Sequence, residues 1–147
     1  MFRRQRRCRG RGDDRLYGVL GNDSLNGEGG SDSLRGGAGL DTFNLNYHEG
    51  DGTGRDTIED FVRGEDKLYL HVHTDSAYLE NFYDFDSNGN GALDSADDYV
   101  RVESVTHNGI TRTSTVIDVS DVATETGELS LVVFGVTGLT ASDFLYG

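Results

Sequence analysis

The sequence predicts an all-β protein, in which a parallel β-roll is followed by a β-rich C-terminal cap with an inserted loop. Three observations support this fold class. A nine-residue repeat occupies the first third of the chain, each repeat carries one large apolar residue, and the last third alternates between apolar and polar residues. At 147 residues the chain is long enough for one domain with a modest core.

Four nine-residue units follow one another without gaps: Arg9–Tyr17, Gly18–Asn26, Gly27–Arg35 and Gly36–Asn44. The fourth residue of each unit is glycine, namely Gly12, Gly21, Gly30 and Gly39. The sixth residue is aspartate, namely Asp14, Asp23, Asp32 and Asp41. The eighth residue is large and apolar, namely Leu16, Leu25, Leu34 and Phe43. Three columns in register over four units indicate a true internal repeat.

Each unit is expected to form one turn and one short strand. Its first six residues are rich in glycine and suit turns that need a positive φ. Its last three residues read polar, apolar, polar, which suits a short strand with one buried face. Two units then make one 18-residue coil, and successive coils stack about 4.8 Å apart as parallel strands. Stacking buries a ladder of apolar residues that a single repeat could not bury.

The aspartates of every second unit fall on the same side of the roll, one coil apart. We therefore expect Asp14 to pair with Asp32, and Asp23 with Asp41. These carboxylates and the turn carbonyls, including those of Gly12, Gly21, Gly30 and Gly39, are the oxygen ligands that Ca²⁺ takes. Without metal the carboxylates repel, so we expect calcium binding and folding to be one event. The alternative is a flexible linker, but a linker has no need of an apolar residue in every repeat.

The inserted loop, residues 84–98, contains a second candidate calcium site. Residues 86–97 follow the EF-hand loop pattern, with aspartate in place of glutamate at the twelfth position. The expected ligands are Asp86, Asn88, Asn90, the Ala92 carbonyl, Asp94 and Asp97. Helical spacing predicts an entering helix at Ala77–Tyr83, whereas Tyr99–Val102 has a strand pattern. We therefore expect a stand-alone EF-hand-like calcium loop, with a metal-free polar loop as the alternative.

The four units resemble the RTX, or hemolysin-type, calcium-binding repeat GGxGxDxUx. The blocks Asp56–Phe61 and Gly64–Leu70 resemble the segment after the roll in serralysin-type proteases and alginate-epimerase R-modules, and Gly138–Gly147 resembles the tail of that family. The resemblance implies that an acid at Asp56 or Asp60 binds a further calcium ion. From the residues alone, these two aspartates could equally cap turns.

The chain divides into a disordered basic arm, residues 1–8, and a single module, residues 9–147. Within the module we expect repeats at 9–47, strands and a short helix at 48–83, the loop at 84–98 and the cap at 99–147. Strand patterns occur at 43–47, 67–72, 99–105, 111–119 and 129–136. Asn108 and Gly109 mark a hairpin turn, and Thr140–Asp143 has the pattern of a capping box.

The net charge of −13 restricts the partners of this chain. Seven of the 13 basic residues lie in the first 15 positions, so from Leu16 onward 24 acids face 6 bases. Such a body repels nucleic acid and anionic membranes, and divalent cations are its natural counter-charge. No segment has the length of a membrane span and no apolar signal core follows the arginines, so we expect neither membrane insertion nor a general secretory signal.

The arginine-rich arm permits three interpretations: an anion-binding tail, a processing or cloning remnant, or a start assigned inside a longer gene. Cys8 is the single cysteine of the chain, so no internal disulfide can form. Of the four histidines, His71 and His73 share one strand face and could hold a metal. Two imidazoles without a third ligand are more typical of surface residues. No catalytic motif is present, so we expect no enzymatic activity.

These observations favour a calcium-dependent folding module of a secreted, extracellular protein. The ending Asp143–Tyr146 pairs an acid with apolar residues and resembles the C-terminal signal of type I secreted proteins; its alternative is a plain strand end. The expected partners are calcium and the type I secretion machinery. The alternative function is that of an accessory R-module that binds an anionic polysaccharide such as alginate, although the sequence shows no basic strip for that ligand.

Overall fold

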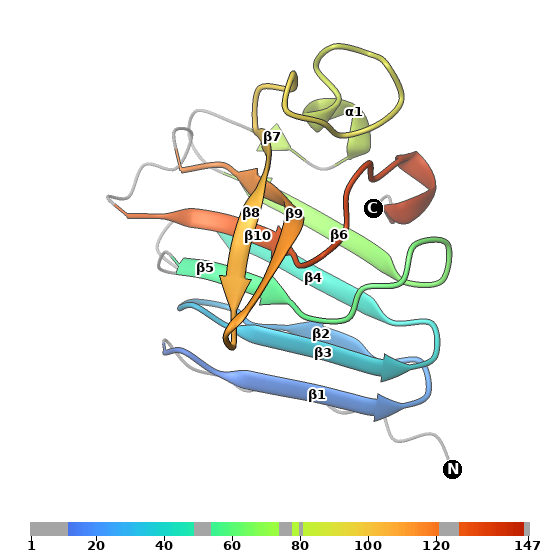
Figure 1. Ribbon diagram of the computed structural model, residues 1–147, viewed down its shortest axis with the longest axis vertical. Helices are drawn as coiled ribbons and strands as arrows, with labels where there is room; N and C mark the ends of the chain where they lie inside the picture. The colour runs from blue at the N-terminus through green and yellow to red at the C-terminus, as the bar shows by residue number, and fades with distance from the viewer. Residues whose placement is uncertain (1–11, 49–53, 74–77, 80, 121–126, 146–147) are drawn as a thin grey trace.

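The computed structural model describes residues 12–48, 54–73, 78–79, 81–120 and 127–145. The predicted basic arm, residues 1–8, lies outside this part of the chain. The described residues form two sheets packed face to face, with the strands of one sheet stacked in front of those of the other in Figure 1. No helix within these residues has the length and apolar character needed to cross a membrane.

The first half of the chain forms the predicted parallel β-roll. Its strands are β1 (Arg15–Leu20), β2 (Ser24–Asn26), β3 (Ser33–Ala38), β4 (Thr42–His48), β5 (Gly54–Ile58) and β6 (Lys67–His73). Consecutive strands alternate between the sheets: β1, β3 and β5 are parallel neighbours in one, and β2, β4 and β6 in the other. Each pair of consecutive strands therefore makes one coil of the roll.

The stacking of the coils follows the sequence repeat and then continues beyond it. Leu16 lies beside Leu34 and Leu25 beside Phe43, so the first two coils are one 18-residue period apart. The third coil places Ile58 beside Leu34 and Leu68 beside Phe43, although longer loops separate these residues in sequence. The stack of coils continues beyond the predicted end of the repeats at residue 47. It does so because the pattern of an aspartate followed two positions later by an apolar residue recurs at Asp56–Ile58 and Asp66–Leu68.

The C-terminal cap completes the sheet that contains β1, β3 and β5. Strand β10 (Leu129–Val133) adds to β5 in parallel, and the hairpin of β8 (Val100–His107) and β9 (Ile110–Asp118) continues that sheet. Asn108 and Gly109 turn the hairpin with φ values of 50° and 78°, as predicted. The hairpin crosses in front of the roll, so that its tip lies over the coils (Figure 1).

Two short elements follow β6, and one differs from the prediction. Strand β7 (Tyr78–Leu79) pairs antiparallel with β6, where the sequence predicted a helix. The helix α1 (Phe82–Phe85) begins later because Asn81 caps it, with a reciprocal hydrogen bond from the Asn81 backbone N–H to Asp84. The apolar residues that suggested one helix over 77–83 therefore belong partly to an edge strand and partly to the start of a later helix.

The chain ends against the second sheet. The predicted capping box at Thr140 starts the turn η1 (Ala141–Asp143). Phe144 then forms a parallel bridge with Leu68 of β6, and the N–H of Leu145 donates to the carbonyl of Leu68. The C-terminal segment is thus held by a strand of the third coil.

The core becomes thicker from the first coil to the cap. Leu34 and Phe43 are buried between the sheets, whereas Leu16 in the edge strand β1 is only partly buried. Helix α1, the loop and the cap add many fully buried side chains, among them Phe82, Phe85, Leu93, Ile117, Leu131 and Leu139. Apolar burial therefore stabilises the part of the chain after the roll much more than the first coil.

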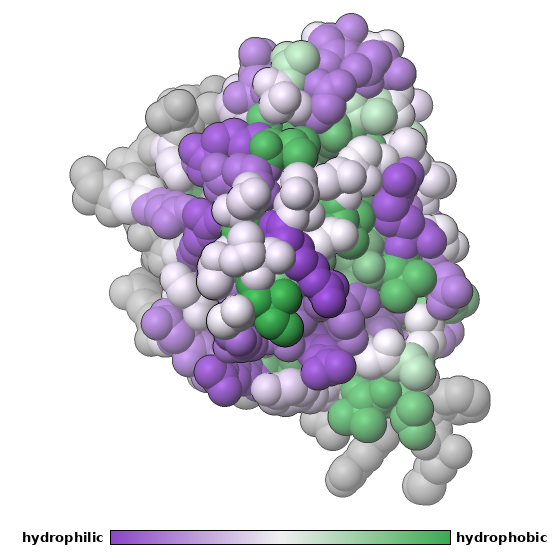
Figure 2. Space-filling view, in the orientation of Figure 1, coloured by the Kyte–Doolittle hydropathy of each residue, from purple (hydrophilic) through white to green (hydrophobic). Residues whose placement is uncertain are grey.

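Two non-glycine residues of the roll have a strained, left-handed backbone, one near the end of β1 and one between β2 and β3. Val19 and Glu28 have φ values of 83° and 68°, in the second position of their repeats. The fourth repeat carries Gly37 there, with a φ of 95°. The side chain of Val19 is 62% exposed, and Figure 2 shows an apolar patch over the end of β1, the strand that contains Val19 and the exposed Leu20. A β-branched residue gains little burial there and bears the cost of a left-handed backbone.

Replacing Val19 by glycine is expected to stabilise the protein. Relief of the left-handed backbone should raise the free energy of unfolding by about 1 kcal/mol, net of the greater entropy of an unfolded glycine. Urea unfolding in excess Ca²⁺ measures the change. Val62→Gly is the control, because Val62 is also exposed but is not among the residues with positive φ. The strain assignment is wrong if V19G is no more stable than the parent chain.

Candidate metal centre

Two columns of aspartates run along the roll at the starts of the strands. The first column is Asp14, Asp32 and Asp56, and the second column is Asp23, Asp41 and Asp66. The predicted pairs, Asp14 with Asp32 and Asp23 with Asp41, are neighbours in these columns. Asp66 was not predicted as a site residue, although Asp66-Lys-Leu68 repeats the spacing of every earlier aspartate to its buried apolar residue.

Each step of a column is a pair of hydrogen bonds between coils. The N–H of Asp14 donates to Oδ1 of Asp32 at 2.7 Å, and the N–H of Asp32 donates to Oδ1 of Asp56 at 3.0 Å. The second column repeats this arrangement at 2.9 and 3.0 Å. In each pair, the backbone carbonyl of the aspartate in the earlier coil also accepts a hydrogen bond from the residue that follows the aspartate in the next coil. The N–H of Ser33, for example, donates to the carbonyl of Asp14. The side chains therefore fix the register of the coils.

Five of the six column aspartates are buried, and three of these have an incompletely paired carboxylate. Asp23, Asp32 and Asp41 are only 4%, 2% and 1% exposed. The second oxygen, Oδ2, of each of these three residues has no hydrogen-bond partner. A buried carboxylate oxygen without a partner costs free energy unless a proton or a cation compensates it. Each of these residues thus presents a free oxygen ligand.

Burial shifts the titration of these groups. Burial raises the pKa of Asp56 to about 7, with a smaller upward contribution from the charge of Asp32. Burial likewise raises the pKa of Asp32, Asp41 and Asp66, and nearby carboxylates add to each shift. The columns therefore hold negative charge only at a cost, which a bound cation would offset.

The glycines of the repeat are required by close approaches around the columns. A Cβ on Gly36 would lie 2.2 Å from Oδ2 of Asp41, and one on Gly27 would lie 2.1 Å from Oδ2 of Asp32. A Cβ on Gly39 would lie 2.0 Å from the carbonyl oxygen of Gly21, and Gly39 also has a φ of 143°. The first-position glycines thus make room for a carboxylate, and the fourth-position glycines for a carbonyl of the coil below.

The donor set of the columns fits a calcium ion. Unpaired carboxylate oxygens lie beside turns whose fourth-position glycine carbonyls approach the next coil, so both kinds of ligand are oxygens. Among the side chains that the structure describes, no three carboxylate, imidazole or thiol groups converge on one point. An ion bound here would therefore need backbone carbonyls as well as aspartates, as expected for Gly12, Gly21, Gly30 and Gly39.

The two aspartates implied by resemblance occupy different positions. Asp56 continues the first column. Asp60 accepts from the N–H groups of Gly36 and Gly37, both at 2.9 Å, and forms an ion pair with Arg35. The contacts of Asp60 are those of the turn-capping alternative.

The predicted calcium loop, residues 86–97, turns its acidic side chains inward onto its own backbone. Asp86 accepts from the N–H groups of Asn90 and Gly91, at 3.1 and 3.0 Å. Asp97 accepts from Asn88 and Asp94 in the same way. Asp86 and Asp97 are buried, and Gly91 takes the sharp turn with a φ of 86°.

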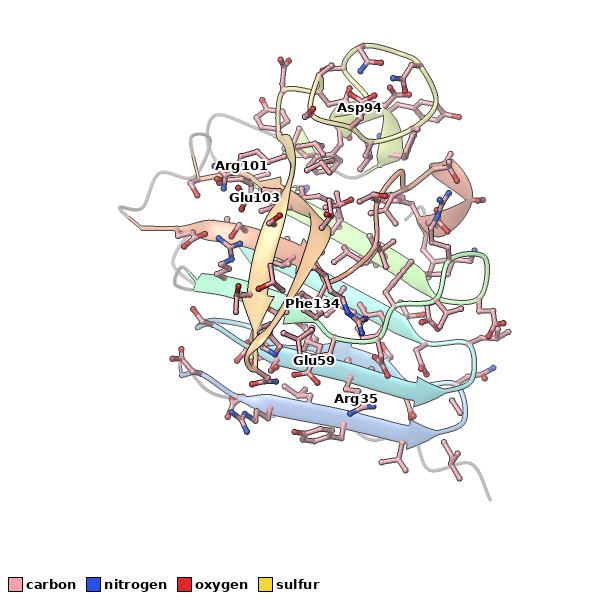
Figure 3. All side chains as sticks on the ribbon, in the orientation of Figure 1. Arg35, Glu59, Asp94, Arg101, Glu103 and Phe134 are labelled. Carbon is pink, nitrogen blue, oxygen red and sulfur yellow. The ribbon has the colours of Figure 1, made fainter. Side chains whose placement is uncertain are left out.

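The remaining predicted ligands of the loop lie at its rim. Asn90 donates from its side-chain amide to Asp94, and its side-chain oxygen accepts from the N–H of Ala92. Leu93 is fully buried, and its N–H donates to Leu139, which anchors the loop to the C-terminal segment. Asp94 marks the loop in Figure 3, far along the molecule from Glu59 and Arg35 on the roll. The loop and the columns are separate sites.

Ser33, Glu59 and His107 lie together where the hairpin tip meets the roll. Oε1 of Glu59 is 2.7 Å from Oγ of Ser33 and 2.8 Å from Nε2 of His107. Burial favours a higher pKa for Glu59, but its contacts with Ser33 and His107 outweigh it and lower the pKa. In a serine nucleophile relay, serine and carboxylate contact opposite nitrogens of the imidazole. Here Glu59 and Ser33 both contact Nε2 of His107, at 2.8 and 3.3 Å, so the cluster fastens the hairpin to the roll.

Comparison with known proteins identifies the repeat. Residues 10–43 match the RTX calcium-binding nonapeptide repeat in four copies. This segment is therefore an array of RTX repeats, which bind Ca²⁺, and the resemblance noted in the sequence is confirmed for it. Its geometry agrees, because the parallel coils and aspartate columns start in these units.

A distant structural match extends over most of the chain. The solution structure of the AlgE6R3 subunit from the Azotobacter vinelandii mannuronan C5-epimerase aligns with 92% of this chain and 79% of its own. The sequence identity is 20% and the TM-score is 0.28. No curated protein matches the chain.

The raised pKa values predict how the metal-free protein responds to pH. The folded state binds protons at Asp56 more tightly than the unfolded state, so stability from this group falls as pH rises from about 4 to 7. Groups with lowered pKa values, such as Asp118 and Asp143, act in the opposite sense, but below about pH 4. In chelator, the β signal in circular dichroism should be stronger at pH 5 than at pH 7.5.

Asp56→Asn is the matched variant, because it keeps an oxygen for the N–H of Asp32 but cannot titrate. Its β signal in chelator should change less with pH than that of the parent chain. A β signal that increases with pH between 5 and 7.5 would show that the buried columns do not control metal-free folding.

Proposed function

We propose that this chain is a calcium-dependent folding module of an extracellular protein that is exported by a type I secretion machinery. The observation that carries the proposal is the set of buried, unpaired Oδ2 atoms of Asp23, Asp32 and Asp41 in an RTX repeat array. At the low Ca²⁺ of a cytosol these carboxylates oppose folding. At the roughly millimolar Ca²⁺ outside cells, ions at the columns would compensate them.

We assign the column ligands by position in the repeat. The carboxylates of Asp14, Asp23, Asp32 and Asp41 would bind calcium together with the carbonyls of Gly12, Gly21, Gly30 and Gly39. Asp56 and Asp66 extend the columns to the third coil and would complete the calcium sites between the second and third coils. Their burial and raised pKa values support this assignment, since each residue places a costly negative charge in the same column as an unpaired carboxylate oxygen of the second coil.

The loop would bind a further calcium ion. Its ligands would be Asp86, Asn88, Asn90, the Ala92 carbonyl, Asp94 and Asp97, in the order of an EF-hand loop. The hydrogen bonds of Asp86 and Asp97 support this, because both carboxylates are already turned toward the backbone inside the loop. Aspartate at the twelfth position shortens the reach of the last ligand, so we expect weak affinity, suited to extracellular Ca²⁺.

The state of the C-terminal end supports export before folding. Asp143 and Phe144, the start of the signal-like ending, are 1% and 4% exposed. Asp143 accepts from the N–H of Gly64 and pairs with Arg63. In the folded module these groups are inaccessible, so a secretion machinery would have to read them in the unfolded chain.

An anionic polysaccharide such as alginate is the alternative ligand, and the charges of the described residues oppose it. Arg35 pairs with Asp60, Arg63 with Asp143, and Arg101 with Asp118. Arg55 contacts both Glu103, which is labelled on β8 in Figure 3, and Glu128. These pairs neutralise four arginines within the described part of the chain and so reduce the positive charge that could attract a polyanion there. Calcium-dependent retention on an alginate column would favour the alternative.

Calcium titration of the full chain by calorimetry and circular dichroism tests the proposal. Addition of Ca²⁺ to chelated protein should produce the β signal together with heat of binding. Asp41→Asn keeps the oxygen for the N–H of Asp23 but removes charge, and should raise the Ca²⁺ needed for folding at least about tenfold. Asp97→Asn should remove one weak site without changing the midpoint of folding.

Glu65→Gln and Asp98→Asn are the controls, since each removes an exposed carboxylate near a column or the loop. Both should bind as the parent chain does. A full β signal in chelator at neutral pH, or D41N titrating like E65Q, would contradict calcium-dependent folding through the columns.

Export can be tested with a reporter protein fused before this chain in cells that carry a type I machinery. The double variant Asp143→Ala with Phe144→Ala should lose export, because the acid and the apolar group of the ending are removed. Ser142→Ala, an exposed neighbour, should be exported normally. Asp41→Asn should leave the cell but fold poorly outside. Equal export of the double variant would show that the ending is not the signal.

A further inference from the structure

Several asparagines of this chain are followed directly by glycine. Such a step is chemically labile, because the backbone nitrogen of glycine, which has no side chain to hinder it, can attack the side-chain amide carbon of the asparagine. The attack closes a succinimide ring and releases ammonia. The four steps are Asn26-Gly27, Asn88-Gly89, Asn90-Gly91 and Asn108-Gly109. The fold restrains them to different degrees.

The two steps in the loop at residues 84–98 are restrained by hydrogen bonds. The N–H of Gly91 donates to Oδ2 of Asp86 at 3.0 Å, and the N–H of Gly89 donates to the carbonyl of Asp86 at 3.3 Å. Attack requires the glycine nitrogen to lose its proton, and a hydrogen bond to a carboxylate or carbonyl oxygen keeps that proton in place. Both steps therefore react slowly in the folded chain.

The step in the roll is restrained by packing. Gly27 is buried, and a Cβ there would lie 2.1 Å from Oδ2 of Asp32, so the backbone has no free space on that side. Oδ1 of Asn26 accepts from the N–H of Glu28 at 3.2 Å, which holds the side chain. Ring closure needs the side chain and the backbone to rotate toward each other, and the packed roll opposes this rotation.

The step at the tip of the hairpin has neither restraint. Asn108 and Gly109 are exposed, and a Cβ on Gly109 would meet no atom within 4 Å. Among the hydrogen bonds of the described residues, none uses the N–H of Gly109. The side chain of Asn108 donates an exposed hydrogen bond of 3.3 Å from Nδ2 to Oε1 of Glu59. The glycine nitrogen and the amide carbon are therefore both accessible to water and to each other.

We propose that Asn108 is a site of spontaneous deamidation, and that its products loosen the hairpin tip from the roll. The backbone nitrogen of Gly109 gives its proton to solvent and bonds to Cγ of Asn108. The Cγ–Nδ2 bond then breaks, and Nδ2 takes a proton from solvent and leaves as ammonia. Water opens the ring at either carbonyl carbon, which yields aspartate or isoaspartate. The net reaction exchanges an amide for a carboxylate, so no oxidant or reductant takes part.

Either product acts against the contacts that fasten the tip. The aspartate product loses the donor to Glu59 and places a second carboxylate beside it, where like charges repel. Isoaspartate also adds an atom to the main chain, which disturbs the two-residue turn that pairs His107 with Ile110. The other end of β9 remains bound to β10, so the change is confined to the tip and to its cluster with Ser33.

Peptide mass spectrometry tests the site on the full chain, incubated in saturating Ca²⁺ and mildly alkaline buffer. Asn108 should exchange NH₂ for OH at least about tenfold faster than the other three asparagines, because hydrogen bonds or packing must first be broken there. An isoaspartate-specific methyltransferase should label the same peptide. In urea all four steps should react at similar rates, since the restraints are lost. A folded chain in which Asn108 reacts no faster than the others would overturn the assignment.

Two variants of Asn108 separate the chemistry from its consequence. Asn108→Gln keeps an amide for Glu59 but cannot close the same ring, so the fast reaction should be lost. Asn108→Asp reproduces one product, and the amides of the hairpin tip should exchange hydrogen with solvent about threefold faster than in the parent chain. Asn22→Asp is the control, since it adds the same charge at another exposed asparagine and keeps the oxygen that accepts from Leu40. Tip exchange in N108D equal to that in N22D would overturn the loosening.

Discussion

The stacking of buried aspartates is the interaction on which this structure depends. Each column joins coils through backbone N–H groups that donate to Oδ1 of the next aspartate, at 2.7 to 3.0 Å. These bonds set the register but bring carboxylates together in a protein interior, where like charges repel and burial raises their pKa values. The same contacts that define the roll therefore oppose it until a cation or a proton is present.

The columns explain why the roll tolerates loops of different length. Only the aspartate and the apolar residue two positions later must recur in register, as Asp32 and Leu34 do with Asp56 and Ile58. The chain between them can lengthen from an 18-residue to a 24- or 25-residue spacing without loss of either contact. Longer loops add little closure entropy, so the third coil needs no perfect repeat.

Much of this arrangement was predictable from local pattern, and the remainder depended on contacts that are distant in sequence. The 18-residue period gave the first two coils and the pairs Asp14–Asp32 and Asp23–Asp41. Asp66 shared their spacing to an apolar residue but followed no glycine-rich unit, so the repeat alone did not reveal it. Strand β7 was missed because pairing with β6 overrode a helical pattern.

The order of the coils also links calcium to the C-terminal end. The cap has the thick apolar core, but β10 requires β5 as its neighbour, and Phe144 requires Leu68 of β6. Both edges belong to the third coil, whose aspartates complete the two columns. On the proposed function, ions that stabilise the columns create the edges that the cap covers, and the covered segment includes the signal-like ending. Calcium would then fold the roll and hide that ending in one cooperative step, which makes export and folding mutually exclusive states of the chain.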